Sequence, residues 1–226
     1  MNSNFIKVYD EKIEELRKLT KAAKSFETAM QLALNVHAMT HTGVVSDSLS
    51  ATYVDELING LKDHDFIVMP TEKDETIAWH LWHIARIEDI VGNLLIAKQP
   101  QIFNEQWMKR MNVSVKDTGN AMSDEEIIKL SIEIDKKELI NYRNTVGTGT
   151  RKIIKNLSYS DLKRKPEQQD LQRIVAEGGL TEDKNSIWLK DFWGRLTIGG
   201  TVLLPLTRHH MMHLPDSYRI KETIYM

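Results

Sequence analysis

The longest helical periodicity in the chain covers residues 72–97. A step of about 100° per residue places its apolar side chains on one broad face, with Arg86, Asp89 and Asn93 on the opposite one. The apolar positions are Ile77, Leu81, Ile84, Ile87, Val91, Leu94 and Leu95. This pattern predicts one amphipathic helix, which at about 1.5 Å per residue is roughly 39 Å long, the length of a bundle helix.

The flanking residues predict where this helix begins and ends. Thr71 and Asp74 form a capping-box pattern directly after Pro70, which is typical of a helix N-terminus. Pro100 enforces the stop, because proline cannot continue a helix.

Several other segments have helical character, whereas alternating β-branched runs that would indicate strands do not recur. Helices are predicted over residues 7–19, 26–42, 53–61 and 123–157, with breaks at 43–50 and 158–194, and a last helix contains residues 202–214. Ser123 and Glu126 form a capping box for the helix over 123–157, and Pro205 either starts or kinks the last helix. The sequence therefore predicts an all-α four-helix bundle with additional short helices and one long crossover.

Composition and charge limit the classes of function. No repeat or linker divides the 226 residues, so we predict a single domain over residues 1–226. The absence of cysteine excludes disulfides, thiolate nucleophiles and cysteine-ligated metal centres. A net charge of −2 favours neither nucleic acid nor an acidic membrane as a partner, and basic residues 151–173 are expected to be solvated. No signal peptide or membrane span is recognisable, so we expect a cytoplasmic protein.

Gly147 and Gly149 weaken the later turns of the helix predicted over 123–157. A Gly-x-Gly pattern can mark a phosphate-binding loop. Here no strand precedes it and no Gly-Lys-Ser/Thr follows, so we assign no nucleotide site.

Histidines are the most informative polar residues in the sequence. They fall into three groups and one isolated position: His37 and His41; His64; His80 and His83; His209, His210 and His213. Residues three or four apart share one face of a helix, so each group can present two imidazoles to a common point. Three neutral imidazoles from two helices, with water as the fourth ligand, would complete a tetrahedral divalent-metal site with one exchangeable position.

Histidines at these spacings also occur as ordinary core or surface residues. We expect His37 and His41 to have a structural role as core or pocket residues. His64 lies between two aspartates in a polar loop and is expected on the surface.

Two stretches resemble the DinB-like superfamily of metal-binding four-helix bundles, which includes bacterial thiol-dependent S-transferases. Residues 76–89, Thr-Ile-Ala-Trp-His-Leu-Trp-His-Ile-Ala-Arg-Ile-Glu-Asp, resemble its second bundle helix. Residues 205–214, Pro-Leu-Thr-Arg-His-His-Met-Met-His-Leu, resemble its fourth helix, where the family carries His-x-x-x-His. The resemblance extends from about residue 26 to residue 221.

The resemblance implies His83, His209 and His213 as the metal ligands. It also implies an up-down-down-up bundle, a homodimer, Zn or Ni as the divalent metal, and a low-molecular-weight thiol as a possible cosubstrate. Two points stay open. Helical periodicity places His80 nearer the centre of the apolar face than His83, and Pro215 disfavours a helix directly after His213.

The leading functional hypothesis is a metal-dependent transferase or hydrolase that acts on a small molecule, with thiol or water as the nucleophile. The candidates for residues around the metal or the pocket are His80, His210, Arg208, Trp79, Trp82 and Trp193. One alternative is a non-catalytic metal- or ligand-binding or stress-response module of the same fold. Another is a structural bundle whose histidines are core and surface residues.

Overall fold

The computed structural model describes residues 3–72 and 74–225, and within these ranges it is all-helical, without strands. The predicted fold class is confirmed. The elements are α1 Ser3–Leu19, α2 Phe26–Met39, α3 Gly43–Ser46, α4 Tyr53–Ile58, α5 Ile77–Asp89, α6 Glu105–Met111, α7 Asp124–Glu133, α8 Lys136–Lys155, α9 Gln168–Ala176, α10 Lys184–Arg195, α11 Ile198–Leu203 and α12 His210–Tyr225. Two π-helical segments extend this set: Ile90–Ile96 continues α5, and Leu204–Arg208 joins α11 to α12.

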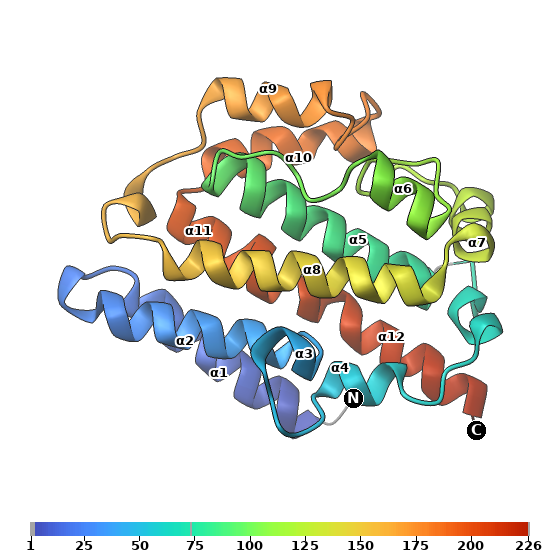
Figure 1. Ribbon diagram of the computed structural model, residues 1–226. Coiled ribbons are helices and arrows are strands. Elements are labelled where there is room, and N and C mark those ends of the chain that lie inside the picture. Colours follow the sequence, from blue (N-terminus) through green and yellow to red (C-terminus); the bar gives the residue numbers. More distant parts are fainter. Residues whose placement is uncertain (1–2, 73, 226) are drawn as a thin grey trace.

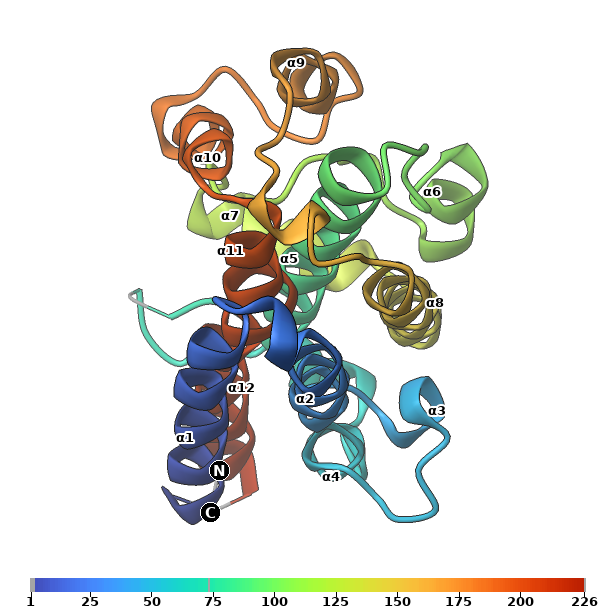
Figure 2. The ribbon, with the colours of Figure 1, turned by 90° about the vertical axis from the view of Figure 1, so that its left-hand side faces the viewer.

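Four rods form the bundle: α2, α5, α8 and the rod made by α11 and α12. In Figure 1, α2 and the last rod run from left to right, whereas α5 and α8 run from right to left, which is the up-down-down-up order. Figure 2 shows α5 at the centre, between α8 and α11, with α1 packed outside α2.

Apart from residues 1–2, 73 and 226, which are not described, no helix has both the length and the hydropathy of a membrane span.

The helix predicted over residues 72–97 begins later than expected. Thr71 does donate a hydrogen bond to Asp74 at 2.7 Å, but both residues lie in the loop before the helix. The N-cap is Thr76, whose hydroxyl accepts from the backbone N–H of Trp79 at 3.0 Å. The predicted cap at Thr71 is therefore wrong, and Thr76, which stands directly before the apolar run at Ile77, caps the helix instead.

The central helix α5 differs from the predicted amphipathic helix because it has no solvent-exposed face. Every residue of α5 and of the π-helical segment after it is buried. The face that carries Arg86, Asp89 and Asn93 is covered by the chain that follows, because the Asp89 carboxylate accepts from the backbone N–H groups of Ile102 and Phe103 at 2.9 and 2.8 Å. The polar residues therefore form an internal hydrogen-bond network.

The helix predicted over residues 123–157 is divided into two, α7 and α8. The capping box of Ser123 and Glu126 is present, as predicted. A second cap, the Asp135 side chain, accepts from the backbone N–H of Glu138 at 2.9 Å and starts α8 in a new direction. The predicted connection over 158–194 contains α9 and a longer helix, α10.

The last helix continues through Pro215 to Tyr225, although proline was expected to disfavour it. Pro205 lies in the π-helical segment before α12, where the backbone N–H of His209 donates to Leu204 five residues earlier at 2.9 Å. This wider turn sets the directions about the helix axis in which the side chains of His209 and His213 project.

Two apolar clusters form the core, and α5 with its continuation belongs to both. Residues up to Ala85 pack in one cluster, and residues from Ile87 onward pack in the other. Two groups of buried polar residues lie near this junction.

Candidate metal centre

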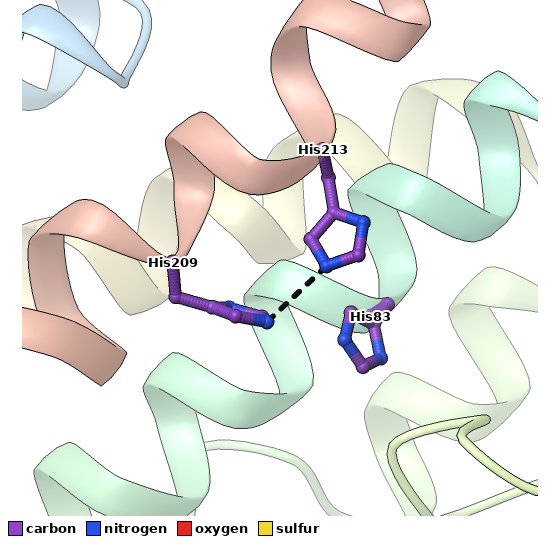
Figure 3. Close-up of side chains that lie close together, drawn as sticks. All are labelled: His83, His209 and His213. Carbon is purple, nitrogen blue, oxygen red and sulfur yellow. Dashed lines mark hydrogen bonds between the residues drawn. The ribbon is translucent and has the colours of Figure 1, made fainter.

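Three histidines from two rods converge on one point. His83 comes from α5. His209 directly precedes α12, and His213 lies in α12 one turn further on (Figure 3). One nitrogen of each ring lies within 4.8 Å of the others, and the Nε2 atoms of His209 and His213 are 3.2 Å apart. Ligands at about 2.0–2.1 Å from a tetrahedral Zn are roughly 3.3 Å apart, so this separation fits a shared divalent ion.

The ring of His83 is fixed in one tautomer. Its Nδ1 lies 2.7 Å from the carbonyl oxygen of Thr118, which only accepts, so Nδ1 carries the proton and donates. This leaves the Nε2 lone pair for a metal. The indole of Trp79 stacks on the imidazole at 4.5 Å with an interplanar angle of 8° and holds its orientation.

The Thr118 carbonyl belongs to a loop that is hydrogen-bonded to α5 through four consecutive carbonyl groups. Arg86 donates to Lys116 at 2.9 Å, Trp82 to Asp117 at 3.1 Å, His83 to Thr118, and Trp79 to Gly119 at 3.2 Å. Gly119 has φ +79°, and a Cβ there would lie 2.7 Å from the indole nitrogen of Trp79. Nothing in the helical periodicity indicated Thr118, because its role is carried by the backbone of a loop distant in sequence.

All three histidines are neutral. Burial, followed by repulsion from His213 in its protonated form, holds the pKa of His83 well below its usual value, and burial acts in the same way on His209. Burial, with the neighbouring His209 and His80, lowers the pKa of His213 to about 2. Divalent metals bind the neutral imidazole, so the residues present fit such an ion.

His80 does not join this group. Its Nδ1 lies 2.9 Å from the Ser217 hydroxyl, and its Nε2 lies 3.3 Å from the carboxylate of Glu75. Both ring nitrogens are therefore engaged. Of the two histidines that the sequence left open, His83 is the one whose free nitrogen faces His209 and His213.

A cavity of about 420 Å³ opens beside the three histidines. Its walls are mainly apolar and include two of the tryptophans singled out in the sequence, Trp79 and Trp193, together with Phe192. Trp188 and Met212, which are 49% and 58% exposed, also line it. The carboxylate of Glu75 lines the same cavity, and its hydrogen bond with His80 lowers its pKa. The sequence analysis did not single out Glu75.

The remaining candidates lie elsewhere. Among the described residues that line the cavity, Trp82, Arg208 and His210 are not found. Trp82 is fully buried in the apolar core, and Arg208 is exposed. His210 follows His209 directly, so it leaves the helix about 100° away and faces a second polar group. His64 is exposed and contacts Asp65, as expected for a surface histidine.

The second polar group contains His37 and His41 of α2, Glu88 of α5, Arg143 of α8 and His210. All five side chains are buried. The Nε2 atoms of His37 and His41 lie 2.8 and 3.0 Å from the two oxygens of Glu88, and the Nε2 of His210 lies 3.4 Å from the second of them. Burial alone would raise the pKa of Glu88, but His41 and His37 hold it well below its usual value. The sequence analysis singled out the histidines of this group but not Glu88.

A model of the DinB superfamily matches residues 48–215, a stretch that contains His83, His209 and His213 and ends before the last turns of α12. No curated protein matches the chain. His37 and His41 lie before the matched stretch. The match covers well over half of the chain and agrees with the helical bundle, so the chain belongs to the DinB superfamily.

Proposed function

We propose that this protein is a metal-dependent enzyme that transfers or hydrolyses a small, largely apolar molecule, with Zn or Ni held by His83, His209 and His213. One observation supports this proposal above the others: three neutral imidazoles, close enough to share an ion, face a cavity of about 420 Å³. A buried structural ion would have no need of such a cavity.

The residues around the histidines have separate roles. When bound, the ion would supply Lewis-acid chemistry and lower the pKa of a water or thiol nucleophile. Thr118 and Trp79 keep the His83 ring in its ligand tautomer and orientation. The Glu75 carboxylate is anionic and is oriented by its hydrogen bond with His80, and it would accept the proton that the nucleophile loses.

The cavity walls indicate the class of substrate. Trp79, Phe192 and Trp193 present apolar surface, so they favour a molecule with an apolar or aromatic body and exclude water from the reacting atoms. The electrophilic group of that molecule would face the histidines, and its remaining part would extend toward Trp188 and Met212.

Elemental analysis of the purified, untagged protein tests the first half of this proposal. We expect the wild type and the surface control His64→Ala to hold about one more tightly bound Zn or Ni per chain than His83→Ala/His209→Ala does. If the wild type holds no ion even after Zn and Ni are added, the proposed site is wrong.

A turnover screen tests the second half. Apolar esters, amides and alkylating electrophiles would be offered with water alone and with added low-molecular-weight thiols. We expect Glu75→Gln to keep the metal but to lose about 10²-fold or more in kcat, as a general base does. Stoichiometric metal without turnover on any of these compounds would favour the alternative, a non-catalytic metal- or ligand-binding module.

A further inference from the structure

The contacts of His41 require a positive species beside Glu88. The Nδ1 of His41 lies 2.9 Å from the carbonyl oxygen of His37, and a carbonyl only accepts, so this nitrogen carries a proton. The Nε2 of His41 lies 3.0 Å from a carboxylate oxygen of Glu88, which also only accepts. A neutral His41 would therefore direct a lone pair at an anionic oxygen, unless a proton or a metal ion lies between the two.

The donor spacing fits a metal ion. The Nε2 of His37 lies 2.8 Å from the other oxygen of Glu88, and one donor atom from each of the three residues lies within 4.8 Å of the others. Ions with ligands at about 2.0–2.2 Å place neighbouring ligand atoms roughly 2.8–3.6 Å apart, depending on the coordination geometry. Two imidazoles and one carboxylate form a ligand set that suits divalent transition metals.

The groups around His37, His41 and Glu88 orient these side chains but leave some buried polar atoms without hydrogen-bond partners. The His41 hydrogen bond to the His37 carbonyl is the kind of second contact that orients metal-binding histidines. Among the described residues, the Nδ1 of His37 and the Nε and Nη1 of Arg143 have no hydrogen-bond partner although they are fully buried. Buried polar atoms without partners commonly mark a missing water or ion.

Arg143 and His210 limit the strength of this site. The Nη2 of Arg143 donates to the Thr40 carbonyl and lies 3.4 Å from the Nδ1 of His210. His210 then keeps its proton on Nε2, which lies 3.4 Å from Glu88 and has no hydrogen-bond partner among the described residues, so it offers no lone pair to an ion there. The guanidinium charge opposes a nearby divalent ion, whereas the described residues that line the cavity beside the three-histidine group include no lysine or arginine.

We propose that His37, His41 and Glu88 form a second divalent transition-metal site, separate from His83, His209 and His213. Full burial makes it a structural site that joins α2 to α5, and it fills after the first site. The proposal does not depend on any catalytic activity. Two of its ligands, His37 and His41, precede the stretch matched to the superfamily, and the third, Glu88, lies within it.

Metal titration of the full-length chain tests the proposal, with Co²⁺ as the probe. Because the site is enclosed, the protein is unfolded in urea, refolded with excess Co²⁺ and dialysed before elemental analysis and visible absorption spectroscopy. We expect two ions per chain in the wild type and one in His83→Ala/His209→Ala/His213→Ala. Adding Glu88→Gln to that triple variant should weaken the remaining binding at least about 100-fold.

Two further variants keep the test decisive. His210→Asn in the same background removes a neighbour of Glu88 but no ligand, so the ion should remain. If Glu88→Gln fails to fold, His41→Gln takes its place, with circular dichroism as the check on folding. A folded triple variant that binds no Co²⁺, with both nitrogens of His41 protonated in ¹⁵N NMR, would overturn the proposal and assign a shared proton instead.

Discussion

At the scale of single residues, a glycine inside a helix shows how the buried polar group shapes its neighbours. Gly147 lies within α8, where glycine costs about 1 kcal/mol relative to alanine. A Cβ at this position would lie 2.5 Å from Cδ2 and 2.8 Å from Nε2 of His41. The absence of a side chain therefore lets α8 approach the imidazole, and no phosphate-binding role is needed to explain it.

We predict that Gly147→Ala destabilises the protein by roughly 1–3 kcal/mol, because the added methyl group overpacks against a buried ring. Urea unfolding measures the difference. Gly149→Ala in the same helix is the control. Among the described residues its Cβ meets only the tip of Ile102, at 3.1 Å, so the gain in helix propensity should keep that variant close to the wild type or above it. Equal stability of the two variants would contradict this steric explanation.

At the scale of elements, α5 is the scaffold on which both polar groups are built. It contributes His83 to one group and Glu88 to the other, and its start is fixed by Thr76. The hydroxyl of Thr76 also lies 2.6 Å from the Ser131 hydroxyl, which connects the start of α5 to α7. The position of this N-cap therefore sets the register of the whole helix.

Replacing Thr76 by alanine should cost about 1–2 kcal/mol, because a buried cap and its partner Ser131 both lose a hydrogen bond. Thr71→Ala is the matched control. Thr71 is exposed in the loop, so its loss should change stability by no more than about 0.5 kcal/mol. Chemical unfolding of the two variants side by side decides which threonine caps the helix, and a larger loss for Thr71→Ala would place the start where the sequence alone predicted it.

At the scale of the whole molecule, the bundle holds many of its histidines in neutral form within its core. Burial lowers the pKa of His83, His209, His210 and His213, and it lowers that of His41 to about 4. These residues come from α2, α5 and the last rod, so the effect belongs to the bundle and not to one helix. The unfolded chain has no such burial and binds protons near the usual histidine value of 6.5.

This difference predicts that the metal-free protein loses stability as the pH falls below about 6.5. The unfolded state then gains protons that the folded state does not accept until about pH 2 for His213. Each such group lowers the free energy of unfolding by about 1.4 kcal/mol per pH unit within that window, and none of this loss is present above it.

Urea unfolding in the presence of chelator at pH 7.5, 6.5 and 5.5 measures how steeply the free energy of unfolding changes with pH. His213→Asn should reduce this slope by the contribution of one histidine, about 1.4 kcal/mol per pH unit. His64→Asn, which removes an exposed histidine, should leave the slope unchanged. A flat profile between pH 6.5 and 5.5 would show that these imidazoles are not held neutral in the fold.

Local spacing in the sequence was enough to predict an all-α bundle, its principal helices, and the face shared by His209 and His213, because helix formation and i,i+4 proximity follow from a few neighbouring residues. The family motif added His83. Only the tertiary structure decided that Glu88 meets His37 and His41, that the Thr118 carbonyl orients His83, and that the polar side of α5 is buried. Each of these contacts joins residues far apart in the chain, so it depends on how the helices pack and not on the periodicity of any one of them.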